Sequence, residues 1–151
     1  MLRSRSPLFA LAALTSILAT APLAAQAAGQ RTPVVGEGQR ISPTLSPGIR
    51  VGNLLWASGQ LGTSPTDTTI AGQTQRSLEN LDKVFKAAGT TLAAAATKCT
   101  VFLTDVKDFA GMNAVYSKFF PTNPPARSTV VVAALVVAGG KVEIECQGVV
   151  P

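Results

Sequence analysis

The sequence predicts an α+β domain in which two helices pack on one face of a mixed β-sheet. Two stretches carry apolar residues at helical spacing, and four others carry the β-branched and apolar runs typical of strands. Along the chain these stretches follow one another as strand, helix, strand, helix, strand, strand. Without its first 27 residues the chain retains about 124, which is enough for one hydrophobic core.

The first 27 residues have the three parts of a secretory signal peptide. Arg3 and Arg5 precede an apolar run over residues 8–23, and small residues flank Gln26 before the expected cleavage near Ala27. A membrane-spanning helix needs roughly 20 strongly apolar residues, whereas this run is shorter and is interrupted by polar residues and a proline. We therefore expect an exported protein, periplasmic or secreted, with no membrane attachment after cleavage.

Residues 28–47 are rich in glycine, proline and serine and have no apolar periodicity. We expect an extended leader there, followed by a single domain over residues 48–151. A turn at Gly52-Asn53 precedes a strand predicted over residues 54–58, with a further candidate strand near Ile49. The polar residues 63–69 predict a loop.

Two amphipathic helices follow. The first is predicted to end at Gly89, and its apolar stripe comprises Leu78, Leu81, Phe85 and Ala88. A β-branched and aromatic run over residues 97–103 predicts a central strand. The second helix is predicted to be capped within residues 105–108 and stopped by Pro121. Its apolar stripe comprises Phe109, Met112, Tyr116 and Phe119.

The last two strands are predicted over residues 127–137 and 142–149, joined by a tight turn at Gly139-Gly140. Side chains alternate between the faces of a strand. One face of the first strand therefore presents Arg127, Thr129 and Val131. In the second strand Glu143, Glu145 and Gln147 share a face, opposite Val142, Ile144 and Cys146.

The chain has no histidine, which excludes Ser-His-Asp and Cys-His nucleophile systems. Its two cysteines form no CxxC motif, so no metal site is expected. Without Arg3 and Arg5, eleven basic residues face eight acidic ones, and the basic residues are scattered. A net charge near +3 without a basic stripe argues against a nucleic-acid partner.

Cys99 and Cys146 both lie in apolar, strand-like runs, where cysteine is usually inert filler. An oxidising compartment would permit a disulfide between them. We expect two buried thiols in preference to a disulfide.

Glu143 and Glu145 have two interpretations. Glutamates inside an apolar segment are costly unless they are solvated or paired, and an exposed sheet face would solvate both. Alternatively, Glu143 and Arg127 belong to a pocket for a small anionic ligand, since the planar fork of arginine matches the two oxygens of a carboxylate.

Five motifs occur in a fixed order along residues 45–149. They are residues 52–60 (GNLLWASGQ), the helix 75–89, residues 100–105 (TVFLTD), the helix 109–120 with Asn113 and Tyr116, and the C-terminal set PARS at 125–128, Leu135 and VEIE at 142–145. Together they resemble the motifs of the reactive-intermediate deaminase family (Rid, or YjgF/YER057c/UK114).

The resemblance implies a chorismate-mutase-like α+β fold, a homotrimer with ligand clefts between subunits, and no metal or organic cofactor. The implied activity is hydrolysis of 2-imino acids, or their enamine tautomers, to 2-oxo acids and ammonia. Arg127 would bind the substrate carboxylate, and Glu143 would position or activate the attacking water. Gly59, with Ser58 beside it, would line the pocket, and Asn113 would add a polar contact.

Two positions depart from the family pattern. Thr129 stands where imine-hydrolysing members commonly have a cysteine, and Leu45 stands where they commonly have a pocket tyrosine. Thr129 would line the pocket with a different shape, and Leu45 would make its wall more apolar. Two other functions remain open, namely a non-catalytic binding module for a small carboxylate and the ribonuclease or translation-inhibitor activity associated with some relatives.

Overall fold

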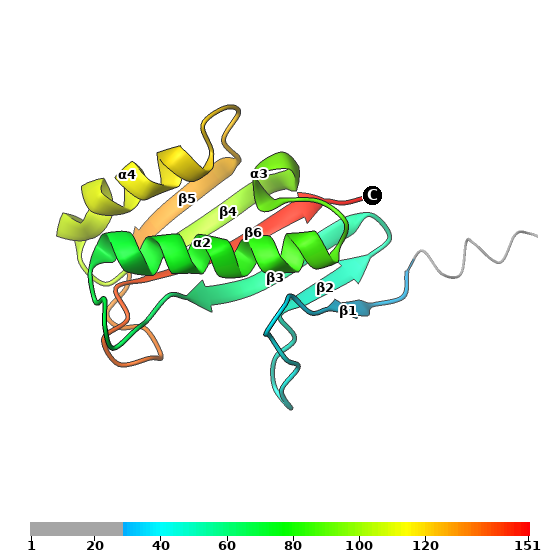
Figure 1. The fold of residues 1–151 in the computed structure, drawn as a ribbon, viewed down its shortest axis with the longest axis horizontal. Coiled ribbons are helices and arrows are strands. Elements are labelled where there is room, and N and C mark those ends of the chain that lie inside the picture. Colours follow the sequence, from blue (N-terminus) through cyan, green and yellow to red (C-terminus); the bar gives the residue numbers. More distant parts are fainter. Residues whose placement is uncertain (1–28) are drawn as a thin grey trace, which may run out of the picture.

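A computed structural model describes residues 29–151 as an α+β domain (Figure 1), which confirms the predicted fold class. Six strands form one sheet in the order β1-β2-β3-β6-β4-β5. The strands are β1 (Thr32–Val34), β2 (Gly48–Val51), β3 (Leu54–Leu61), β4 (Ala96–Leu103), β5 (Ala126–Val131) and β6 (Val142–Val149). Neighbouring strands are antiparallel except β4 and β5, which are parallel.

The helices cover one face of this sheet (Figure 1). They are α2 (Ile70–Ala87), the short α3 (Leu92–Ala95) and α4 (Phe109–Phe119), which follows the 3₁₀ turn η1 (Val106–Asp108). The short helix α3 was not predicted. None of the helices within residues 29–151 is long and apolar enough to cross a membrane.

Helix α2 begins earlier than its predicted apolar stripe. The hydroxyl of Thr69 accepts a hydrogen bond from the backbone N–H of Gly72 at 3.1 Å, which caps the first turn. At the other end Gly89 has a φ of +89°, and the N–H of Thr90 bonds the carbonyl of Phe85 at 3.1 Å. A left-handed residue of this kind ends a helix without strain only when it is glycine, as predicted.

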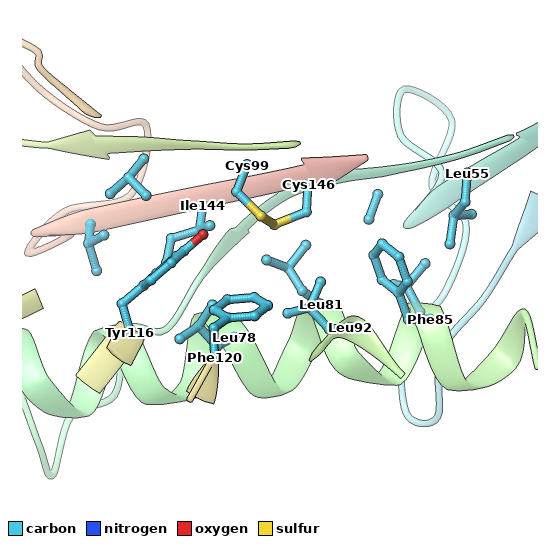
Figure 2. Close-up of a cluster of buried hydrophobic side chains, with 14 of the residues drawn as sticks. Leu55, Leu78, Leu81, Phe85, Leu92, Cys99, Tyr116, Phe120, Ile144 and Cys146 are labelled. Carbon is cyan, nitrogen blue, oxygen red and sulfur yellow. A yellow bond between two sulfur atoms is a disulfide. The ribbon is translucent and has the colours of Figure 1, made fainter. Parts of the chain in front are cut away.

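The core lies between the sheet and the helices. Leu78, Leu81 and Phe85 of α2 and Met112 of α4 are fully buried, and Tyr116 of α4 is nearly so. They pack against the alternate residues of the sheet that face the helices, with Ile144 and Cys146 among them (Figure 2).

The last two strands differ from the prediction. Strand β5 ends at Val131, and β4 lies between β5 and β6 in the sheet, so the two do not form a hairpin. Residues 132–141 cross the end of β4, where the N–H of Thr104 bonds the carbonyl of Lys141 at 3.1 Å. The tight turn at Gly139-Gly140 is present, since Gly139 has a φ of +76° and Gly140 N–H bonds Val137 O at 3.0 Å.

The predicted leader contributes to the sheet. Its residues Thr32–Val34 form the edge strand β1, in which Thr32 pairs with Arg50 of β2. The candidate strand near Ile49 is present as β2. The predicted signal peptide, residues 1–27, lies outside the described part of the chain.

Cys99 and Cys146 form a disulfide, so the prediction of two buried thiols is wrong. The two residues pair directly across β4 and β6 with their Cα atoms 4.1 Å apart, and their side chains face the helices (Figure 2). The two cysteines are 47 residues apart, and the sequence does not indicate that their strands are neighbours, because strand order is a tertiary property.

Candidate active site

Arg127 is held by aromatic side chains of α4. The central carbon of its guanidinium lies 4.6 Å from the ring centroid of Tyr116 and 6.0 Å from that of Phe109. Its Nη1 lies 3.9 Å from Met112 Sδ. Within residues 29–151 no carboxylate forms an ion pair with Arg127. Ring faces attract a cation without neutralising it, so the guanidinium can accept an anionic ligand.

The sequence prediction placed Phe109, Met112 and Tyr116 in the core stripe of a helix and gave them no role in the site. Their spacing of three and four residues shows that they share one helix face. The spacing does not show which strand that face meets. In the structure it meets β5, so the stripe also supports Arg127.

Asn113 lies near Arg127 in a groove between α4 and the start of β5. The groove has a volume of about 370 Å³. Its lining residues are Asn113, Tyr116, Ser117, Phe120, Pro124, Pro125 and Arg127. The structure thus brings the two predicted site residues Asn113 and Arg127 together at one concave surface.

Thr129 lies two residues beyond Arg127, on the same face of β5, and does not line this groove. Its hydroxyl is buried beneath the helices and has no hydrogen-bond partner in the described part of the protein, and the same holds for the hydroxyl of Tyr116. Burial raises the pKa of Tyr116 to about 12, with Arg127 acting in the opposite direction. The guanidinium of Arg127 therefore packs against an uncharged Tyr116 ring.

Glu143 lies on the opposite face of the sheet, in contact with Gly59. Strand β3 is irregular between Ala57 and Gln60, and a Cβ built on Gly59 would lie 2.0 Å from Glu143 Oε1. Only a glycine leaves room for the carboxylate there. Partial burial, and then the repulsion of Glu145, raise the pKa of Glu143. In addition, Glu143 and Glu145 border a hollow of about 270 Å³ lined by Phe102, Val132, Ala134, Leu135 and Val136.

Ser58 organises the backbone beside Gly59. Its N–H bonds the carbonyl of Pro47 at 2.9 Å, and its hydroxyl donates to the carbonyl of Ser46 at 2.7 Å. These bonds fix the loop that carries Leu45, whose side chain is exposed. The hydroxyl of Ser58 is thus engaged by the protein itself, and Ser58 shares with Leu45 a cavity of about 310 Å³.

Arg127 and Glu143 do not meet within one chain. Arg127 pairs in register with Cys99, whose side chain faces the helices, whereas Glu143 pairs with Phe102 on the uncovered face. Residues paired across neighbouring strands point to the same face. The molecule therefore has two half-sites: the arginine groove (Asn113, Tyr116, Arg127) and the glutamate half-site (Gly59, Glu143, Glu145).

Fold and half-sites together define a class of small α+β domains that carry a cationic groove on one sheet face and a carboxylate on the other. The family model described as endoribonuclease L-PSP matches residues 39–150. The chain belongs to this family, known also as the reactive-intermediate deaminase (Rid, YjgF/YER057c/UK114) family, as its motifs predicted.

Named relatives agree with this assignment. The chloroplastic reactive intermediate deaminase A of Arabidopsis thaliana is 39% identical over 106 residues, which are 67% of this chain and 56% of that protein. The RutC family protein y4sK of Sinorhizobium fredii is 45% identical over 105 residues, 66% of this chain and 82% of that one. The structure of E. coli TdcF with bound serine has a TM-score of 0.66 at 35% identity, covering 74% of this chain and 91% of that one.

Proposed function

We propose that the protein hydrolyses 2-imino acids and their enamine tautomers to 2-oxo acids and ammonia, in a cleft between two copies of the chain. The observation that carries the proposal is the placement of Arg127 and Glu143 on opposite faces of the sheet. A site that uses both groups needs the arginine groove of one copy and the glutamate half-site of another. A relative named a deaminase and a relative with bound serine support a ligand with an amino-acid carboxylate.

The uncovered face of the sheet suits a second copy. Large apolar side chains on this face keep 40–47% of their surface exposed, and no helix within residues 29–151 packs on it. They are Leu54, Trp56, Val130 and Val149. Exposed apolar patches of this kind mark protein–protein contacts, and contact through them would bring Glu143 against a neighbouring chain. The resemblance implies a homotrimer, and this state is part of the proposal.

In this cleft the guanidinium of Arg127 binds the substrate carboxylate through two parallel hydrogen bonds. A water held by Glu143 attacks the imine carbon, and a C–O bond forms as the C=N double bond becomes single. Glu143 takes the proton that the water loses and returns it to the nitrogen. The C–N bond then breaks and ammonia leaves, while the new hydroxyl passes its remaining proton to Glu143 and becomes the carbonyl oxygen of the 2-oxo acid. Glu143 releases this proton to the departing ammonia or to solvent. An iminium carbon is already electrophilic, so orientation and one proton acceptor suffice.

The raised pKa of Glu143 supports its role as proton acceptor. A carboxylate with a higher pKa is a stronger base, which favours transfer of the water proton to Glu143. The causes of the raised pKa, burial and the neighbouring Glu145, come from this chain alone.

The first test generates imines in situ with an amino-acid oxidase and follows loss of the semicarbazide-trapped imine. We expect the wild type to accelerate imine loss and both Arg127→Ala and Glu143→Ala to remove that acceleration. No acceleration by a folded oligomer, on any amino acid tried, would overturn the proposed reaction. Loss in Arg127→Ala with full activity in Glu143→Ala would leave carboxylate binding intact and remove Glu143 from the mechanism.

Subunit mixing tests whether the site is shared. When the two inactive variants are unfolded together and refolded, about one cleft in four should combine an intact Arg127 with an intact Glu143. We expect recovery of roughly a quarter of the wild-type activity, with no recovery when either variant is refolded alone. No recovery from a mixture that forms mixed oligomers would place both groups in one chain.

Binding without catalysis is the second candidate, since the TdcF structure holds a serine. It needs the arginine groove and leaves Glu143 without a role. Carboxylate binding that survives Glu143→Ala, without imine hydrolysis by the wild type, would favour it. The endoribonuclease activity named in the family description is tested by an RNA degradation assay with the purified protein, in which the Arg127→Ala variant is the control.

Export also remains a proposal. The buried Cys99–Cys146 disulfide supports it, because disulfides persist in oxidising compartments and are rare in the cytosol. Cell fractionation and N-terminal sequencing of the purified protein test it. An intact N-terminus in the cytosolic fraction would contradict it.

A further inference from the structure

We propose that the arginine groove selects 2-imino acids with aromatic or branched apolar side chains, a substrate class that rests on the proposed function. The groove has a charged end and an apolar end. A ligand with a carboxylate at one end and an apolar group at the other would fill both ends of the groove.

One wall of the groove is a single stripe of α4. Asn113, Tyr116, Ser117 and Phe120 follow one another at spacings of three, one and three residues, so they share one helix face. At 1.5 Å rise per residue, this stripe is about 10 Å long. Pro124 and Pro125 form the opposite wall, just before Arg127.

The charge lies toward the N-terminal half of the stripe. The guanidinium of Arg127 contacts Tyr116, Phe109 and Met112, which belong to the first two turns of α4. Asn113 adds its amide at this end. A ligand carboxylate bound here directs the rest of the ligand along the stripe toward the C-terminal end of α4.

The other end of the groove is apolar. Phe120, itself 3% exposed, packs against Tyr116 with ring centroids 4.7 Å apart and forms the floor of the groove, which Pro124 and Pro125 also line. A three-carbon acid such as pyruvate, bound through its carboxylate at Arg127, would leave this end unfilled. Ligand sites of this size usually combine apolar walls with a few polar groups that fix orientation. A phenyl or isobutyl group packed against Pro124 and Pro125, above the floor formed by Phe120, would bury its apolar surface at this end.

Product binding tests the selectivity independently of catalysis. Isothermal titration of the purified protein compares phenylpyruvate and 4-methyl-2-oxopentanoate with pyruvate. We expect the two larger acids to bind at least about tenfold more tightly, because burial of several CH₂ or ring carbons is worth more than 1.4 kcal/mol. Arg127→Ala should weaken binding of all three.

Two tryptophan variants, a test and its control, probe the apolar end of the groove. Ser117 is exposed on the groove wall, so Ser117→Trp fills the apolar end without entering the core. Lys118→Trp places the same side chain one residue further along α4, outside the groove. We expect Ser117→Trp to abolish the preference for the larger acids, whereas Lys118→Trp, whose side chain lies outside the groove, keeps the preference and the wild-type affinity for pyruvate.

Three outcomes separate the two proposals. Equal affinities for all three acids, each dependent on Arg127, would overturn the selectivity and leave the proposed site standing. A preference that survives Ser117→Trp would show that the larger groups bind elsewhere and would likewise overturn it. Binding that is absent, or unaffected by Arg127→Ala, would overturn both the selectivity and the carboxylate site.

Discussion

Arg127 illustrates how one residue is prepared for a ligand. Its cation is placed over the ring of Tyr116 and beside Met112, with no carboxylate paired to it in the described chain. An internal ion pair would have occupied the same hydrogen-bond donors that a ligand carboxylate needs. Aromatic support fixes the guanidinium and leaves those donors unoccupied, which a lysine cannot reproduce with its single point charge.

Glu145 should control the pH at which Glu143 works. Its negative charge contributes to the raised pKa of Glu143, so Glu145→Gln should lower that pKa. Activity is lost as pH falls through the pKa of Glu143, and the acidic limb of kcat/KM should therefore move to lower pH. Steady-state imine assays between pH 4 and pH 7 measure kcat/KM over this acidic limb.

The matched control for this prediction is Glu79→Gln, which removes the same charge from an exposed position on α2. It should leave the acidic limb unchanged. A limb that stays in place in Glu145→Gln, or moves equally in both variants, would contradict the assignment of Glu143 as the titrating group.

Gly59 is the residue that admits the Glu143 carboxylate. In Gly59→Ala the new methyl group would lie 2.0 Å from Glu143 Oε1 and would therefore overlap it. The flexible glutamate can rotate away, so we expect a change of less than about 1 kcal/mol in the free energy of unfolding. Displacement of the proton acceptor should lower kcat by about 10²-fold or more. Urea unfolding and the imine assay measure the two effects, and normal activity would contradict this role of Gly59.

At the scale of elements, Gln73 ties α2 to the β5–β6 connection. Its side chain is 1% exposed, donates to the carbonyl of Gly139 at 2.9 Å and accepts from the N–H of Lys141 at 2.8 Å. These bonds hold the crossing segment 132–141, which forms the apolar border of the glutamate half-site. One buried amide thus links the helix layer to the segment that borders the glutamate half-site.

Gln73→Ala should loosen this connection. Two backbone groups lose their partners, each worth roughly 1–3 kcal/mol when left unsatisfied, so we expect a loss of about 2–4 kcal/mol in the free energy of unfolding. Limited proteolysis should find faster cleavage within residues 132–141. The control Gln75→Ala removes an exposed amide that bonds only Glu79 and should change neither measurement. Equal stability of the two variants would contradict the role of Gln73.

In the whole molecule, the disulfide joins the neighbouring strands β4 and β6 on the sheet face that the helices cover. Cys99 and Cys146 are at most 1% exposed. A reductant reaches them only when the core opens, so reduction should be slow in the native protein and fast in denaturant. The bond closes a loop of 47 residues, for which loop-closure entropy predicts about 4 kcal/mol of stabilisation.

Urea unfolding of the oxidised protein and of a Cys99→Ala/Cys146→Ala variant measures this stabilisation. We expect the variant to lose about 2–4 kcal/mol and to keep its oligomeric state, because the bond lies away from the uncovered sheet face. Equal stability, or two free thiols on alkylation of the unfolded wild type, would contradict the bond.

Assembly is decided at this scale too. Each chain presents the arginine groove on its helix-covered side and the glutamate half-site on its uncovered side. A single copy therefore presents Arg127 and Glu143, the two groups that the proposed reaction needs, at separate surfaces. The proposed cleft exists only where two copies bring these surfaces together.

The sequence by itself determined most elements, because they depend on local physics. Periodicities of 3.6 and 2 residues located α2, α4 and the strands β3 to β6, and Gly89 marked the end of α2. Alternation assigned Arg127 and Glu143 to defined faces of their strands. The motifs that cover residues 45–149 identified the family, and the residues named for the site came from the same motifs.

Strand order, and with it the spatial relations between distant residues, follows from the packing of the whole fold. Insertion of β4 between β5 and β6 places Cys99 beside Cys146, turns an expected hairpin into a crossing connection, and sets the faces of Arg127 and Glu143 relative to each other. The physical reason is that neighbours in a sheet are selected by packing and backbone hydrogen bonding over the whole core. No local pattern around residue 99 or residue 146 encodes that choice.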